Sequence, residues 1–329
     1  IVIFRNISCF KPNAINMYKF SMLKIYQQTV AKQVNFSGIG LHTGKNCNLK
    51  INPGHDNQGI VFKRVDLKEN NIIYSKYENV SSAKLCTTLS NQYNVKVSTV
   101  EHLLAALYLA EIDNALIEID SEEIPIMDGS SKDFLDKLLK NDIRQLNSKR
   151  KYLKILEKVE FIDGEKKISI QPNTQSLEVE FQLNYKNKII GKQKNKINFE
   201  LDNFDEITES RTFCLFEDIE KIKKAGLAKG GSLDNAVVVD NDKIINKEGL
   251  RNDKEFVNHK ILDLVGDFLL SGYRILGKVN CYQGGHQLTN LFLRTLMQSN
   301  KSFQSVEISQ IKYKENSSQT QLSKLAVSA

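Results

Sequence analysis

The sequence predicts an α+β fold built from two similar units. The chain has 329 residues, its short alternating segments precede helical segments, and this order occurs twice. A length of this size suffices for about two domains of roughly 150 residues each. A run of strands followed by helices is typical of α+β proteins, in which helices pack on one face of a sheet. We therefore expect two α+β domains, each with its own sheet.

The first domain is expected over residues 28–147. Between Gln28 and Ile73, alternating segments are interrupted by glycines and by a Pro-Gly pair, which indicates antiparallel strands with tight turns. A helix is predicted from Ser98 to about Glu111. Its predicted neighbours are a strand over 114–120 and a helix over about 131–140.

The second domain is expected over residues 152–300, after a basic stretch at 148–151 that we interpret as a linker. An apolar insertion is expected at about 214–245, although its three valines at 237–239 also resemble an ordinary buried strand. Residues 314–329 are polar and small, and are expected to form a mobile tail. The predicted elements are strands around 152–200, helices near 215–225, 253–271 and 289–299, and a strand over 274–281.

Composition and charge exclude several classes of protein. The net charge of +7 falls to +3 without residues 1–24, which carry four cations and no acid. A charge of +3 gives little support to nucleic-acid binding. No apolar run approaches the ~18 residues needed to span a bilayer, so membrane contact would be peripheral at most.

The five cysteines are widely spaced and form no Cys-x-x-Cys pair, which favours a reducing compartment over a disulfide framework or a thiolate metal site. We expect a cytoplasmic protein. Residues 1–27 form an extension of uncertain status. Its first 24 residues permit an organellar targeting peptide, but we favour an over-extended translation start, because Met22 lies just before the patterned region.

The segment 252–272 is the most informative stretch of the chain. Asn252 is the predicted N-cap, Glu255 follows three residues later, and Gly272 is the expected stop. His259, Asp263 and Asp267 are spaced four residues apart, so all three share one helix face. An imidazole and a carboxylate on adjacent turns can bind one metal ion.

Two other segments carry a histidine beside residues suited to catalysis. A catalytic zinc ion usually has three nitrogen or oxygen ligands, and His102, His259 and Asp263 would supply this set. Glu101 and His286 are then the candidates for general base and general acid. Each has an alternative: Glu101 could close a capping box with Ser98, His102 could be a core histidine, and the aspartates could be solvated charges.

A family resemblance covers the chain from about Gln28 to about Leu296. The matching segments resemble the UDP-3-O-acyl-N-acetylglucosamine deacetylases, which catalyse the committed step of lipid A synthesis. The resemblance implies two α+β domains with mainly antiparallel sheets and a zinc ion between them. The segments that carry it are Ser37–Gly44, Ser98–Leu103, Ile112–Asn114, Glu123–Ser130, Arg211–Phe213, Gly230–Asp234, Gly249–Arg251 and Phe256–Asp263.

The resemblance also implies a role for each candidate residue. His102, His259 and Asp263 correspond to the zinc ligands, and Glu101 to the base that deprotonates the attacking water. His286 corresponds to the group that protonates the leaving amine. The remaining correspondences are Asp267 as the carboxylate that orients His286, Thr212 as a donor to the oxyanion, Lys260 as a substrate-phosphate contact, and Phe213 as part of the acyl-chain passage.

Two of these remaining roles have a simpler alternative. Thr212 could be a loop hydroxyl and Lys260 a solvated charge on an exposed helix face.

The chain also departs from the family pattern without changing a zinc ligand. Gln283 replaces a usual Lys, and Asn258 replaces a frequent Arg. Asn187-Lys188 stands where His-Pro is frequent, and Gly284-Gly285 where Ser-Gly or Thr-Ser is commoner.

The implied function is zinc-dependent removal of the N-acetyl group from UDP-3-O-acyl-N-acetylglucosamine in the bacterial cytoplasm. We expect a monomer that binds no nucleic acid. Two alternatives remain open at this point. The chain could be a catalytically weak relative that binds the nucleotide-sugar lipid, a hypothesis raised by Gln283, or, more remotely, a basic RNA-binding protein.

Overall fold

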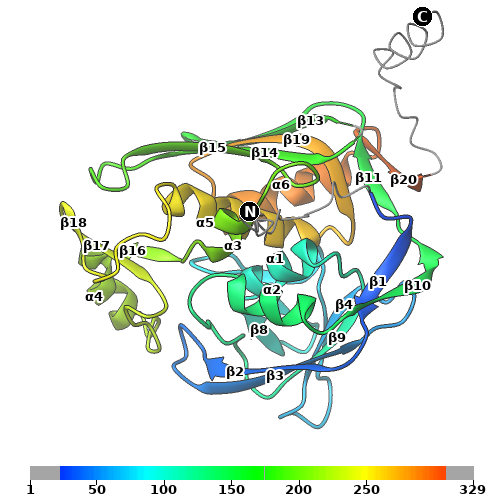
Figure 1. The fold of residues 1–329 in the computed structure, drawn as a ribbon, viewed down its shortest axis with the longest axis horizontal. Helices are drawn as coiled ribbons and strands as arrows, with labels where there is room; N and C mark the ends of the chain where they lie inside the picture. The colour runs from blue at the N-terminus through cyan, green and yellow to red at the C-terminus, as the bar shows by residue number, and fades with distance from the viewer. Residues whose placement is uncertain (1–22, 174, 309–329) are drawn as a thin grey trace, which may run out of the picture.

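The computed structural model describes residues 23–173 and 175–308, and it has the predicted α+β fold. One sheet lies on each outer face, and most of the helices lie between the two sheets (Figure 1). In the described part of the chain, no helix is long and apolar enough to cross a membrane. The predictions for most of the N-terminal extension and for the tail at 314–329 fall outside the described residues.

The first sheet has the strand order β2-β3-β9-β4-β5. Its pairs are antiparallel except for β4 with β9. Buried and exposed residues alternate along β3 and β9, because successive side chains of a strand point to opposite faces. The strands are β2 (Val34–Ile39), β3 (Asn46–Pro53), β4 (Ile60–Arg64), β5 (Ile72–Tyr74) and β9 (Ala115–Ile119).

A small three-stranded sheet, which the sequence did not predict, follows the first four of these strands. It consists of β6 (Val80–Ser82), β7 (Thr88–Ser90) and β8 (Lys96–Ser98), after a short 3-10 helix at Tyr77–Asn79. The strands are too short for a clear alternating pattern. The loop from β6 to β7 and the residues after β8 contribute to the site described below.

The second sheet is mixed, with seven strands, and β19 lies at its centre. β19 is antiparallel to β13 and parallel to β11 and β14. The sheet is therefore less purely antiparallel than the sequence pattern suggests. Its strands are β11 (Tyr152–Ile155), β12 (Val159–Asp163), β13 (Lys166–Pro172), β14 (Leu177–Asn184), β15 (Lys192–Asn198), β19 (Arg274–Tyr282) and β20 (Phe303–Val306).

The helices between the sheets are α1 (Glu101–Leu109), α2 (Lys132–Leu139), α3 (Asp205–Glu209), α5 (Glu255–Leu269) and α6 (His286–Gln298). All nine residues of α1 are buried, as expected for a helix that is apolar nearly all round. α1 packs against α5 at Gly266. A Cβ at that position would lie 2.1 Å from the Glu101 carbonyl oxygen, so the close approach of the two helices requires glycine.

The start of α5 differs from the prediction. The helix begins at Glu255, and no side chain caps it. The carboxylate of Glu255 accepts hydrogen bonds from buried Arg211 instead, so a tertiary ion pair has replaced the expected capping box at Asn252. Gly272 ends the segment as predicted, with a φ of +76°. The last helix, α6, begins at His286, three residues earlier than expected.

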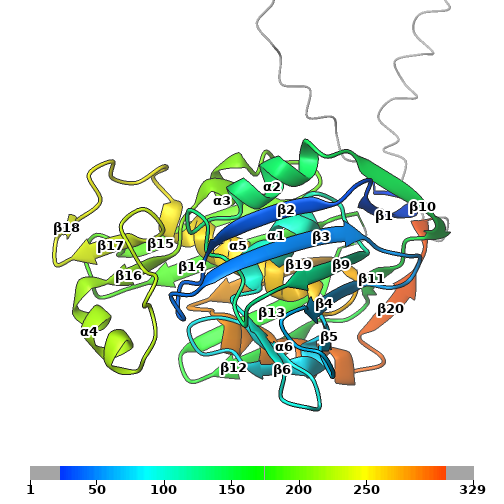
Figure 2. The ribbon, with the colours of Figure 1, turned by 90° about the horizontal axis from the view of Figure 1, so that it is seen from below.

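The predicted insertion is a small unit at one end of the molecule (Figures 1 and 2). Its β17 contains the three valines, which are buried. β17 pairs in parallel with β16 and in antiparallel with β18. The elements are β16 (Phe213–Leu215), α4 (Phe216–Lys224), β17 (Val237–Asp240) and β18 (Lys243–Ile244).

At the opposite end, β1 (Tyr26–Val30) pairs with β10 (Ile143–Lys149). The basic stretch at 148–151 is therefore not an irregular linker. Ser148 and Lys149 complete β10, and Arg150 is buried in ion pairs with Glu111 and Asp113. Electrostatic pairing at these positions overrides the exposed character that a run of basic residues suggests. The domain boundaries at 28–147 and 152–300 stay a prediction.

Candidate active site

Helices α1 and α5 bring together three residues that lie far apart in sequence. His102 stands in the first turn of α1, and His259 and Asp263 lie on successive turns of α5. Asp263 Oδ1 lies 3.6 Å from His102 Nε2 and 3.3 Å from His259 Nε2. One ligand atom from each residue lies within 4.8 Å of the others. The spacing-based hypothesis that these three residues meet is thus supported by the geometry.

The three donor groups fit a divalent metal ion. Asp263 Oδ1 has no hydrogen-bond partner among the described residues, although a buried carboxylate oxygen normally has one. His259 Nδ1 donates to the Ser210 carbonyl at 3.1 Å, which leaves the lone pair of Nε2 directed toward the cluster. Burial lowers the pKa of His259 to about 3, so its imidazole is neutral and able to bind a metal.

Glu101 lies directly beside this cluster and is buried. Its Oε1 lies 3.7 Å from His286 Nε2, and its Oε2 accepts a hydrogen bond from the Thr87 N–H at 3.0 Å. Ser98 donates to the Glu122 carbonyl, so the capping-box alternative for Glu101 is wrong. Burial raises the pKa of Glu101, as expected for a carboxyl group removed from water.

His286, the first residue of α6, is held by Asp267. Its Nδ1 lies 2.8 Å from Asp267 Oδ2. Burial lowers the pKa of His286, but Asp267, Glu101 and Asp263 outweigh burial and raise it to about 10. The imidazole is therefore charged at neutral pH, which suits a group that donates a proton.

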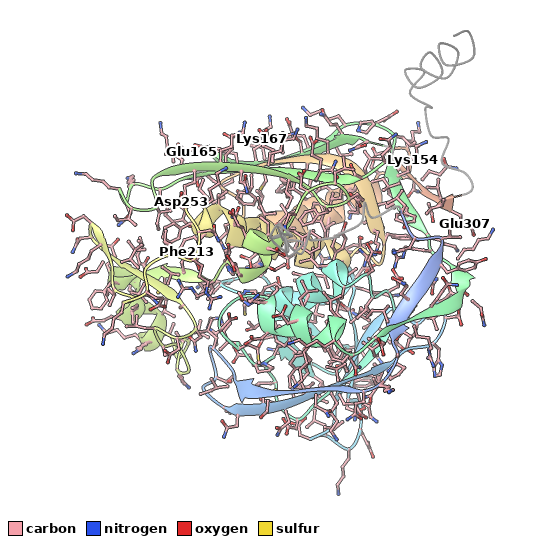
Figure 3. The ribbon with its side chains drawn as sticks, in the orientation of Figure 1. Lys154, Glu165, Lys167, Phe213, Asp253 and Glu307 are labelled. Carbon is pink, nitrogen blue, oxygen red and sulfur yellow. The ribbon has the colours of Figure 1, made fainter. Side chains whose placement is uncertain are left out.

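Lys260, Phe213 and Thr212 surround the same cleft. Lys260 Nζ forms an ion pair with Asp263 Oδ2 at 2.7 Å and lies 5.5 Å from the centre of the Phe213 ring, so it is not merely a solvated surface charge. Phe213, labelled in Figure 3, packs against Phe256 and His259. The Thr212 backbone N–H donates to Gly129, and Thr212 lines the cleft beside the metal cluster.

Two cavities open from this cleft and share Thr212 and Phe213. The first, about 420 Å³, is polar and is lined by Lys166, Tyr185, Lys260 and His286 among others. The second, about 280 Å³, runs into the insertion and is mainly apolar. Its apolar walls include Leu41, Leu85, Ile219, Ile222, Leu233 and Val238. The arrangement offers a more polar and a mainly apolar compartment next to the candidate reacting centre.

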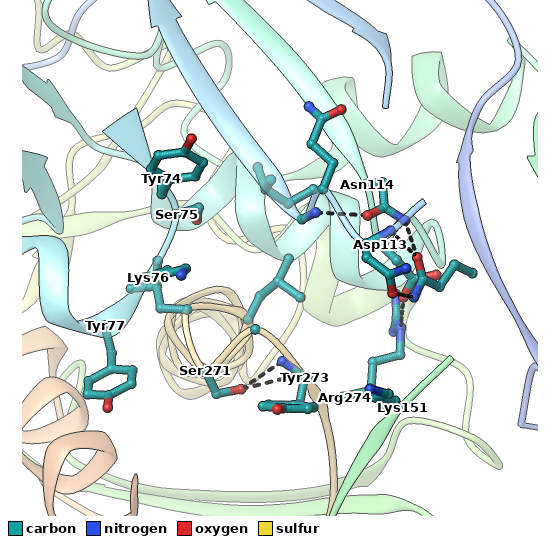
Figure 4. Close-up of a pocket in the computed structure, with 18 of the residues that line it drawn as sticks. Tyr74, Ser75, Lys76, Tyr77, Asp113, Asn114, Lys151, Ser271, Tyr273 and Arg274 are labelled. Carbon is teal, nitrogen blue, oxygen red and sulfur yellow. Dashed lines mark hydrogen bonds and ion pairs between the residues drawn. The ribbon is translucent and has the colours of Figure 1, made fainter. Parts of the chain in front are cut away.

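A cavity larger than these two lies elsewhere. It measures about 620 Å³, and Figure 4 shows Tyr74 to Tyr77 on one side and Asp113, Asn114 and Arg274 on the other. None of the predicted site residues lines this cavity. Volume alone therefore does not identify the site.

Comparison with known proteins agrees with the geometry of the cleft. Residues 27–298 match the family described as UDP-3-O-acyl N-acetylglycosamine deacetylase. A UDP-3-O-acyl-N-acetylglucosamine deacetylase of Idiomarina loihiensis is 41% identical over 86% of this chain and 93% of its own length. Proteins with the same description from Pseudoalteromonas translucida and a Geobacter species are 40% and 41% identical, over 85% and 83% of this chain.

The chain belongs to this deacetylase family. It is a family of metalloenzymes, and His102, His259 and Asp263 form a possible metal site in this member.

One residue of this family member escaped the sequence analysis although its motif was noted. His42 is buried beside the metal cluster, and neither ring nitrogen has a hydrogen-bond partner in the described structure. Its backbone N–H and that of Thr43 donate to buried Glu123. The available signal was a histidine in a segment whose glycines mark turns.

A departure from the deacetylase pattern, Gln283, is engaged within the second sheet. Its side-chain oxygen accepts a hydrogen bond from the Asn184 N–H at 3.0 Å, and its amide donates to the Asn184 carbonyl. Gln283 is absent from the lining of the polar cavity, whereas the next residue, Gly284, contributes to it. The substitution thus ties β19 to β14.

Proposed function

We propose that the protein is a zinc-dependent amide hydrolase that removes the N-acetyl group from UDP-3-O-acyl-N-acetylglucosamine and releases acetate, as a step of lipid A biosynthesis. One observation carries the proposal: His102, His259 and Asp263 converge beside Glu101 and His286 in one buried cleft. The names of the relatives supply the substrate.

Zinc, when bound by the three ligands, would polarise the amide carbonyl and stabilise negative charge on its oxygen. The protein residues supply the proton transfers. Glu101 accepts a proton from the attacking water, and Thr212 donates a hydrogen bond to the developing oxyanion. His286 then gives its proton to the amine nitrogen as the carbon–nitrogen bond breaks.

The pKa shifts support this division of roles. Glu101 must be ionised to act as a base, whereas His286 must be charged to act as an acid. The pKa of Glu101 is raised by burial and that of His286 is raised to about 10 by the adjacent carboxylates. Both required forms coexist between the two pKa values, so the rate should show a bell-shaped dependence on pH.

The two cavities suit the two ends of this substrate. The mainly apolar cavity fits an acyl chain, and the polar cavity with Lys260 fits the anionic nucleotide. Phe213 lines both compartments. We infer that the protein acts as a cytoplasmic bacterial monomer with at most peripheral membrane contact, and that nucleic acid is not a ligand.

The test is metal analysis of the purified protein combined with measurement of acetate release. We expect about one zinc per chain, loss of acetate release after chelation, and recovery when zinc is returned. A protein that binds zinc and the nucleotide-sugar lipid but releases no acetate would instead be the catalytically weak relative considered above.

A further inference from the structure

Thr87 lies in the loop between β6 and β7, beneath the floor of the cleft. It is buried, and it connects three parts of the site through separate atoms. Its hydroxyl donates to Asp267 Oδ1 at 2.7 Å, and its N–H donates to Glu101 Oε2 at 3.0 Å. Its carbonyl accepts from the Val100 N–H, immediately before α1.

These contacts close a ring of interactions. Asp267 uses Oδ1 for Thr87 and Oδ2 for His286 Nδ1, while Glu101 uses Oε2 for Thr87 and faces His286 Nε2 with Oε1. Thr87 itself lines neither the metal cleft nor the polar and apolar cavities, whereas its neighbour Cys86 lines the cleft. Thr87 therefore reaches the reacting groups only through other residues.

We propose that Thr87 is a positioning residue that fixes the carboxylates of Asp267 and Glu101 on either side of His286. The proposal rests on the proposed function of Glu101 and His286. The Thr87 hydroxyl is the only described donor to Asp267 Oδ1. Without it, this buried oxygen would lack a partner, and the carboxylate would rotate to find one. His286 would then lose the orientation that its Nδ1 bond imposes.

The first test compares Thr87→Val, which removes the hydroxyl, with Thr87→Ser, which keeps it. The backbone contact to Glu101 is present in both variants. We expect Thr87→Val to lower kcat by roughly ten- to a hundredfold, since small misplacements of reacting groups have effects of this order. KM should stay within about twofold because Thr87 does not reach the substrate cavities. Thr87→Ser, which keeps the hydroxyl, should retain most of the kcat of the parent.

A matched control is Thr29→Val in β1. Thr29 is also buried, and its hydroxyl donates to the Asn114 carbonyl at 2.6 Å, away from the cleft. This control should lower the melting temperature without lowering kcat. All variants should retain zinc, because Thr87 contacts none of the three ligands.

A second readout does not depend on turnover. In protein with ¹⁵N-labelled histidine, we expect a slowly exchanging Nδ1 proton on His286 in the parent and in Thr87→Ser, and a faster exchanging one in Thr87→Val. If the parent released no acetate but showed this pattern, the proposed function would fail and the positioning role would stand. An active, zinc-loaded Thr87→Val variant with unchanged kcat and an unchanged proton signal would overturn the positioning role alone.

Discussion

The metal cluster (His102, His259 and Asp263) and the Arg150 cluster (Arg150, Glu111 and Asp113) are both buried groups of ionisable residues. They differ in how many of their polar atoms have hydrogen-bond partners. In the Arg150 cluster, every guanidinium nitrogen of Arg150 donates to Asp113 or Glu111. In the metal cluster, Asp263 Oδ1 has no hydrogen-bond donor among the described residues, although two imidazole nitrogens, His102 Nε2 and His259 Nε2, lie within 3.6 Å of it.

This difference distinguishes a buried group with a structural role from one suited to bind a metal ion. A buried charge whose polar atoms all have partners is satisfied within the fold, and removal of one partner destabilises the protein. Buried ligand atoms that converge without partners instead fit an external ion. The pKa of Arg150 is raised by Asp113 and Glu111 despite its burial, so its charge persists. Changes in the two clusters should therefore affect different measurements.

The largest effect is expected at Glu101. Glu101→Gln keeps the shape of the side chain but removes the base, so the rate of acetate release should fall about 10²- to 10⁴-fold. The zinc content and the melting temperature should stay close to those of the parent. An equally fast variant with zinc bound would limit Glu101 to a structural role.

The next largest effect is expected in the Arg150 cluster, and it concerns the stability of the protein. Arg150→Met leaves Glu111 and Asp113 without their main partner, which should lower the free energy of unfolding by about 3–5 kcal/mol in urea denaturation. Zinc binding by the folded protein should be unchanged. Lys149→Met is the control, because its ion pair with Glu307 is partly exposed and contributes about 1 kcal/mol or less. Equal effects of the two substitutions would show that the buried ion pairs of Arg150 contribute no more than a partly exposed pair.

A smaller effect, on both stability and zinc affinity, is expected at Gly266. The Cβ of Gly266→Ala would meet the Glu101 carbonyl, so α1 and α5 must separate, at a loss of about 1–3 kcal/mol of stability. Because His102 lies on α1 and the other two ligands on α5, zinc affinity measured by competition with a chelator should weaken as well. Exposed Gly231→Ala makes only ordinary contacts and serves as the stability control.

The smallest of these effects is a shift of the pH profile, measured relative to the maximal rate of each protein. Burial lowers the pKa of His286, and Asp267 is the strongest of the three carboxylates that raise it to about 10. Asp267→Asn removes that charge, so the pKa of His286 should fall. Since the acid must be protonated, activity should decline at a lower pH on the basic side than in the parent, while the acidic limb set by Glu101 moves less. An unmoved basic limb would assign it to another group.

The sequence predicted best what depends on local spacing. Four-residue spacing placed His259, Asp263 and Asp267 on one face of α5, and the structure confirms this arrangement. The meeting of His102 with that face depends on the packing of α1 against Gly266, which no local pattern records. The residue types offered this meeting as a hypothesis, which the family resemblance then supported.

Other features could not be predicted because tertiary contacts decide them. The pattern from Ser98 to Glu101 is the same for a capping box and for a catalytic base, and only the tertiary bonds of Ser98 to Glu122 and of Thr87 to Glu101 exclude the capping box. The predicted start at Asn252 was wrong because α5 begins at Glu255, whose carboxylate accepts hydrogen bonds from Arg211 and from the Arg251 N–H. Thr87 itself lies in a short loop without periodicity, so its role became visible only through its distances to two carboxylates.

The complete burial of α1 has a consequence for metal exchange. Local opening draws on segments with few buried contacts, and α1, which carries His102, is the opposite of such a segment. Its amide protons should exchange with solvent only at rates near those of global unfolding. Zinc must then enter and leave through the substrate cleft, so an occupant of that cleft should slow the capture of zinc by a chelator.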